Sequence, residues 1–98
     1  MTTFDGGKPP ETIEEAAQHL FFILGGREKD AVAATPKDDL HLLNFGFGAD
    51  IRNAFGLWRG NLALLTDASE NGAPMHPDDV SALILNRLWE LVTNDHPK

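Results

Sequence analysis

The stretch LHLLNFGFGADIRNAFGLWRGNLALL, from residue 40 to residue 65, constrains the fold more than any other part of the chain. Its apolar residues recur in steps of three or four, which is the spacing of one face of an α-helix, at Leu40, Leu43, Phe47, Ile51 and Phe55. Polar side chains, among them Asn44 and Arg52, are set among these apolar positions. The stretch contains no recognisable catalytic motif, so it predicts a helix and indicates no reaction.

The rest of the chain is also typical of helices separated by turn residues. Thr12 and Glu15 form a capping box before a first helix, Thr35 begins the central helix as its N-cap, and Pro77 begins the last helix. No stretch alternates apolar and polar residues as a strand does. We therefore predict an all-α, single-domain bundle of four to five helices with a long glycine-containing central helix. The domain is expected to span 11–93, between flexible tails at 1–10 and 94–98.

Two glycines in the predicted central helix require an explanation. Gly46 and Gly48 each destabilise a helix interior by about 1 kcal/mol relative to alanine. Either a neighbouring helix crosses closely at this point, or the helix breaks at 45–48 and resumes at Asp50. A backbone that approaches a ligand is a third reading, but a single Gly-Phe-Gly without a preceding strand is weak support for it. We favour close packing against a neighbouring helix.

Composition excludes several classes of function. The net charge is −7, which phosphate backbones repel, so nucleic acid is not expected as a partner. The chain has no cysteine, and this fits a reducing compartment such as the cytoplasm. The first residues lack the pattern of a secretory signal, and no apolar run approaches the ~20 residues of a membrane span. We therefore expect a cytoplasmic protein without membrane contact.

Neither a metal nor an enzymatic site is expected. His76 with Asp78 and Asp79 superficially offers metal ligands, but aspartate in a first helical turn is what helix capping favours, and no second histidine is clustered with them. Ser69 and Ser81 are the candidate nucleophiles, and neither lies in a glycine-flanked nucleophile turn. Ser81 comes three residues after Asp78 on the predicted last helix, so its hydroxyl is more simply explained by a bond back to a backbone carbonyl. We expect no catalytic residues and no cofactor.

Arg52 lies close to the buried face of the central helix and therefore needs an anionic partner. The candidates are Asp78 or Asp79 at the start of the last helix, and Asp50 nearby in the sequence. A clamp between helices is the favoured interpretation. The alternative is that Arg52 is presented to an anionic ligand. The residues that would form the clamp are Arg52, Asn53, Asn61, His76, Asp78 and Asp79.

Trp58 and Arg59 lie on a predicted turn between helices, and tryptophan and arginine are the residue types most enriched at binding hot spots. A structural alternative is that Trp58 plugs the end of the bundle with Arg59 stacked on it. The longest predicted loop, 66–75, and an off-stripe tryptophan in the last helix complete the candidate contact surface. The partner-binding candidates are Trp58, Arg59, Glu70, Asn71 and Trp89.

Three motifs resemble those of a family of small bacterial and phage-borne helical domains of unknown function. They are P-E-T-I-E-E-A, then L-N-F-G-F-G-A-D-I-R-N-A-F-G-L-W-R-G-N, then H-P-D-D-V-S, and the resemblance covers about residues 9–92. Asn44 stands where the family often has His, Phe47 stands where it has Leu, and the 66–75 loop is longer than usual. The resemblance implies a helical fold and a bacterial or phage origin, but no activity. It also implies that the pieces I-R-N, L-W-R-G-N and H-P-D-D meet in space, which strengthens the hypothesis of a clamp between Arg52 and Asp78 or Asp79.

Three functions follow as hypotheses. The first is a non-enzymatic, acidic module that binds another protein, as a small regulator or an inhibitor of immunity or anti-defence type. The second is a small-ligand or enzyme site at the junction of Arg52, Asn53, Asn61, His76 and Asp79. The third is self-association as a homodimer, because Leu42 and Phe45 lie opposite Leu40 and Phe47 on the central helix. Central burial of that helix is favoured over an interface.

Overall fold

The computed structural model describes residues 10–59, 61–67, 69 and 71–95. This part of the chain contains five α-helices and two 3-10 turns, and no strand. The predicted all-α class is therefore confirmed. The elements are α1 Ile13–Ile23, α2 Gly26–Ala34, η2 Lys37–Asp39, α3 Leu40–Ala54, η3 Leu57–Arg59, α4 Leu62–Thr66 and α5 Pro77–Asp95.

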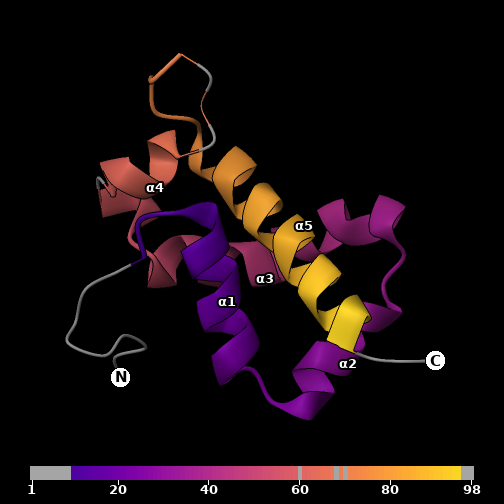
Figure 1. Ribbon diagram of the computed structural model, residues 1–98. Helices are drawn as coiled ribbons and strands as arrows, with labels where there is room; N and C mark the ends of the chain where they lie inside the picture. The colour runs from indigo at the N-terminus through magenta and orange to yellow at the C-terminus, as the bar shows by residue number, and fades with distance from the viewer. Residues whose placement is uncertain (1–9, 60, 68, 70, 96–98) are drawn as a thin grey trace.

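The last helix, α5, is the centre of the bundle. It crosses the molecule diagonally with α1 and α3 packed along it and α2 near its C-terminal end (Figure 1). The predicted long glycine-containing helix is present as α3, but α3 lies beside α5 and is not the central element. The fully buried side chains come mainly from α5, the end of α3 and the segment after it, and include Ile51, Phe55, Leu57, Leu64, Val80, Ile84, Leu85, Leu88 and Val92.

The first helix begins where the capping signal placed it. The backbone N–H of Glu15 donates to Thr12 Oγ1 at 3.0 Å, as an N-cap requires. A second acceptor comes from far along the chain, because the Ile13 N–H donates to Asp67 Oδ2 at 2.8 Å. The Asp67 side chain therefore joins the segment after α4 to the start of α1.

Several helix boundaries differ from the predictions. Thr35 ends α2 and does not begin α3, because its hydroxyl donates to Ala31 O at 2.9 Å. The turn η2 then separates α2 from α3. At the other end of the chain α5 continues through Asp95, two residues past its expected end at 93. Pro10, the last residue of the expected tail, is buried and its carbonyl accepts from Asn61 Nδ2 at 3.1 Å.

The two helical glycines have different surroundings, because Gly46 is exposed and Gly48 is buried. The helix α3 is continuous through both, so the predicted break is absent. A Cβ built at Gly46 would meet no described atom within 4 Å, whereas one built at Gly48 would meet side chains of α3 itself. The predicted close packing against a neighbouring helix is therefore wrong for Gly46, whereas Gly48 is buried on the face of α3 whose Asn44 and Arg52 side chains bond to α5. Gly56, with φ of +69°, ends α3 in the left-handed conformation that favours glycine.

The prediction that α3 is buried on both apolar faces is also wrong. Its inner face packs against α5, but Leu42 and Phe45 on the outer face are 55% and 80% exposed. A pattern of apolar residues on two faces does not say which face meets the core, because both satisfy the same helical period.

Candidate functional site

A group of polar side chains lies between α3 and the first turns of α5. Arg52 Nη1 donates to Ser81 Oγ at 2.8 Å and lies 3.2 Å from Asp78 Oδ1. Ser81 Oγ lies 2.7 Å from Asn44 Oδ1 and 3.0 Å from the backbone oxygen of Asp78. Asn44 Nδ2 donates to that same backbone oxygen at 3.2 Å. We call Asn44, Arg52, Asp78 and Ser81 the α3–α5 polar cluster.

Gly48 makes this cluster possible. Asn44, Gly48 and Arg52 follow one another at intervals of four, so they lie on one face of α3 with the glycine in the middle. A Cβ at Gly48 would overlap Asn44 Oδ1 and would lie 2.7 Å from Asn44 Cγ and 3.1 Å from Arg52 Nη1. The missing side chain therefore leaves room for two polar groups two turns apart to reach the same hydroxyl on α5.

The cluster is closed upon itself. Ser81 is fully buried, and its hydroxyl both accepts from Arg52 and donates within the cluster. Only 11% of the Arg52 side chain is exposed, whereas 55% of Asp78 is exposed, so the ion pair opens to water on the carboxylate side. Groups that satisfy one another in this way join helices and offer a ligand few unpaired atoms.

His76 extends the cluster towards η3. Its Nδ1 accepts from the Asp78 backbone N–H at 3.0 Å, so that nitrogen carries no proton. The 3.8 Å approach of the same nitrogen to Asp78 Oδ2 is for this reason not an ion pair. The imidazole ring and the Trp58 indole form a T-shaped pair, with ring centroids 5.9 Å apart and planes at 88°. His76 therefore connects the polar cluster to an exposed tryptophan.

The structure does not bring all the predicted clamp residues together. Arg52, His76 and Asp78 lie in connected contacts, as described above. Asn53 is exposed. Asn61 caps α4 by accepting from Leu64 N at 3.3 Å, and its Nδ2 donates to Phe55 O at 2.8 Å and to Pro10 O. Asp79 is exposed beside Asp78, with its backbone N–H bonded to His76 O.

The partner-binding candidates occupy different surroundings. Trp58 is 59% exposed on η3 and does not plug the bundle end, where Leu57 is buried instead. Trp89 is half-buried in α5 and donates its indole N–H to Thr35 O at 2.8 Å. Asn71 is exposed, and its amide oxygen accepts from Ser69 Oγ and from Ala73 N. Glu70 and the side chain of Arg59 lie outside the described residues.

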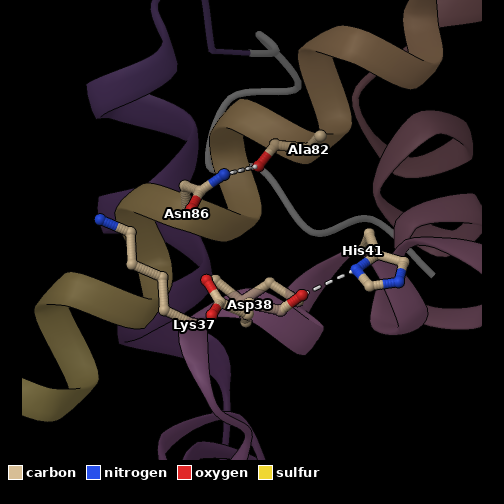
Figure 2. A pocket seen from close by; sticks show the side chains of 6 residues that line it. Lys37, Asp38, His41, Ala82 and Asn86 are labelled. Carbon is tan, nitrogen blue, oxygen red and sulfur yellow. Dashed lines mark hydrogen bonds between the residues drawn. The ribbon is translucent and has the colours of Figure 1, made fainter.

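A shallow hollow of about 180 Å³ lies between η2, the start of α3 and α5 (Figure 2). Two polar side chains of the hollow already form local hydrogen bonds. His41 Nδ1 bonds to Asp38 O at 2.9 Å, and Asn86 Nδ2 donates to Ala82 O at 3.1 Å. Lys37 and Asp38 bring opposite charges to its rim, so no single ligand chemistry is favoured. The lining residues are Lys37, Asp38, Leu40, His41, Ala82 and Asn86.

The described residues include no group of three or more His, Cys, Asp or Glu side chains arranged to hold a metal ion. In the same part of the chain, no helix has both the length and the apolar character needed to cross a bilayer. An ion pair on the opposite side of α5 links that helix to α1, because Arg87 Nε donates to Glu14 Oε1 at 2.6 Å. This hydrogen bond is the main reason why the pKa of Glu14 is lowered, and a second one from Gln18 adds to it.

Asn44 and Ser81 are the cluster residues that the sequence analysis did not assign to the clamp. The sequence predicts for Ser81 a bond back to a backbone carbonyl, which its 3.0 Å contact with Asp78 O confirms, but it does not predict the contacts of Ser81 with Asn44 and Arg52. The useful signal is the series Asn44, Gly48 and Arg52, in which two polar side chains flank a glycine at helical spacing. Such a series indicates that both side chains reach the same partner across the glycine.

Comparisons with known proteins give a family and no function. No curated protein and no solved structure matches the chain. The family model described as a domain of unknown function, DUF6794, matches residues 9–91, which is most of the chain. The chain therefore belongs to the DUF6794 family of domains of unknown function.

Proposed function

We propose that this chain is a non-enzymatic, acidic module that binds another protein in the cytoplasm of a bacterium, as a small regulator or as an inhibitor of immunity or anti-defence type. The polar groups that chemistry would need are engaged with one another in the α3–α5 polar cluster. The exposed surface carries large apolar side chains instead, and these have no role in the core. This division supports binding over catalysis.

The single observation that carries the proposal is the setting of Trp58. Its indole is 59% exposed, but its position is fixed, because the neighbouring Leu57 is buried and His76 contacts the ring. Tryptophan is a frequent hot-spot residue, and an anchor that is already ordered loses little conformational entropy when it binds. Leu62, also 59% exposed, follows on α4 and adds apolar area.

The negative charges near Trp58 favour a partner protein with a basic surface. Asp78 and Asp79 are exposed at the start of α5, close to the His76 that contacts Trp58. The net charge of −7 would attract a cationic protein and increase the rate of encounter. Arg59, Glu70 and Asn71 remain proposed contributors to the same surface. Trp89 is not placed in it, since its N–H is already bonded to Thr35 O.

Affinity capture with a matched pair of variants tests this proposal. Wild type, Trp58→Ala and Phe22→Ala serve as baits in nuclease-treated lysate of the native host. Phe22 is the control because it is an aromatic side chain on α1 with 86% exposure. Both substitutions remove exposed rings, so each is expected to change the free energy of unfolding by less than about 0.5–1 kcal/mol.

The proposal predicts a stoichiometric protein that wild type and Phe22→Ala capture and that Trp58→Ala loses. A purified titration of that protein against the three baits then gives the affinities. The proposal is wrong if the three baits capture the same proteins in the same amounts, or if none captures a stoichiometric protein.

A further inference from the structure

The outer face of α3 is an exposed apolar surface that the rest of the described chain leaves uncovered. Leu42, Phe45, Gly46 and Ala49 share this face, because they are spaced by three, four and seven residues along one helix. Leu42 is 55% exposed and Phe45 is 80% exposed. The face lies opposite the side that packs on α5 and spans about 10 Å, or two helical turns.

Nothing in the described part of the chain explains Gly46. Glycine weakens the middle of a helix relative to alanine, and the described structure leaves open space where its Cβ would be. Gly48, two residues on, is explained by the Asn44 and Arg52 side chains, and Gly46 has no comparable neighbours. A missing side chain between Leu42 and Asp50 lets another backbone approach α3 closely, as small residues do where helices meet.

The charges around this face have one sign. Asp39 is exposed just before its N-terminal end, and Asp50 is exposed along its edge, whereas Asp38 lines the hollow towards α5. Among described residues 37–54 the lysine and arginine side chains are Lys37 and Arg52. The Lys37 ammonium lies 6.0 Å from the Trp89 ring on α5, away from His41 and Asp38 in Figure 2. Arg52 is paired with Asp78.

We propose that the outer face of α3 docks an amphipathic helix of a partner protein, with leucine-like side chains on one face and lysine or arginine along its flanks. A helix that presents apolar residues at i, i+3 or i+4 and i+7 matches the ridge of Leu42, Phe45 and Ala49. Its cations meet Asp39 and Asp50. A second copy of this chain fits less well, because it would place the same carboxylates against one another.

This inference rests on the proposed function only in that both concern protein binding, since it concerns a surface that does not include Trp58. The probe is a synthetic helix of about 18 residues with leucine on one face and lysine elsewhere. One control peptide has the same composition with the leucines distributed around the helix, and another has glutamate in place of lysine. Each is titrated by calorimetry into wild type, Leu42→Ser/Phe45→Ser and Phe22→Ser, after thermal melting has shown that all three are folded.

The expected result is saturable binding of the leucine–lysine helix to wild type and to Phe22→Ser, with affinity reduced roughly tenfold or more in Leu42→Ser/Phe45→Ser. Binding should weaken as salt is added, and both control peptides should bind poorly. Equal affinity for all three proteins overturns the inference, as does equal affinity for the glutamate peptide. A wild-type dimer in sedimentation that the double substitution abolishes also overturns it, because a second copy then covers the face.

The capture experiment and the peptide titration test different surfaces, so either proposal can be refuted while the other stands. If Trp58→Ala captures the same proteins as wild type while the peptide titration gives the expected result, the surface around Trp58 is wrong and the α3 docking face stands. If capture depends on Trp58 while the peptide binds all variants alike, the proposed function stands and the α3 face has no such role.

Discussion

Replacing Arg52 with alanine tests how the α3–α5 polar cluster joins the two helices. The guanidinium donates to the buried Ser81 hydroxyl at 2.8 Å and meets the half-exposed Asp78 carboxylate at 3.2 Å. A hydrogen bond from a charged donor contributes about 1.5–3 kcal/mol, whereas an ion pair open to water contributes about 0–1 kcal/mol. We therefore expect Arg52→Ala to lower the free energy of unfolding by about 2–4 kcal/mol, chiefly because the bond to Ser81 is lost.

This magnitude is smaller than that of a fully buried ion pair, in which removing one partner costs about 3–5 kcal/mol. The reason is that water can hydrate Asp78, which is 55% exposed, once Arg52 is absent. A loss of about 2–4 kcal/mol corresponds to a fall in melting temperature of about 8–32 °C in a domain of this size. Thermal melting followed by circular dichroism gives the first reading.

Urea unfolding of Arg52→Ala, Ser81→Ala and Asp78→Asn, singly and in pairs, then separates the two contacts. The double-mutant cycles should give a coupling energy of about 1–2 kcal/mol between Arg52 and Ser81, and less than about 1 kcal/mol between Arg52 and Asp78. The reasoning is refuted if the Asp78 coupling is the larger one, or if Arg52→Ala unfolds like wild type.

Four further substitutions have definite expected signs. Gly48→Ala should destabilise the fold by about 1–3 kcal/mol, because the added methyl group displaces side chains of the α3–α5 polar cluster. Gly46→Ala should stabilise the fold by about 0.5–1 kcal/mol, because the space around Gly46 is open. Equal effects of the two substitutions in urea unfolding would contradict this expectation. The pKa of Glu14 is lowered by Arg87, so the folded form binds protons less readily than the unfolded chain and this stabilisation is lost as pH falls below about 4.5. Glu14→Gln removes this titration, so the free energy of unfolding should fall less steeply between pH 5 and pH 3, roughly the range in which a lowered carboxyl pKa acts. An unchanged slope would count against the Arg87 contact. Asp67→Ala removes the distant acceptor at the start of α1 and should destabilise by about 1 kcal/mol, measured in the same way; no change would mean that this cap is not formed in solution.

The helices could be predicted from sequence because their signals are local. The Thr12 capping contact, Gly56 at the end of α3 and Pro77 at the start of α5 all depend on neighbours within one turn. Thr35 shows the limit of such signals, since its hydroxyl can cap a following helix or bond back to the preceding one, and here it does the latter.

What the sequence could not provide are contacts between distant segments. Arg52 had three aspartates as possible partners, and only the placement of α3 on α5 selects Asp78. Asp79, the next residue on the helix, points about 100° away from it. The Asp67 contact with Ile13 joins residues 54 positions apart, and no local pattern announces it. The exposure of Leu42 and Phe45 likewise depends on which face of α3 meets the core.

The central claim is a division of roles, in which the α3–α5 polar cluster stabilises the fold and the outer surface binds a partner. It is tested most directly by comparing capture from host lysate with Trp58→Ala and with Ser81→Ala, each at a temperature where circular dichroism shows it folded. The account predicts that Ser81→Ala, though less stable, retains the protein that wild type captures, and that Trp58→Ala loses it. Loss of that protein by folded Ser81→Ala, together with retention by Trp58→Ala, would contradict the account and place function in the cluster.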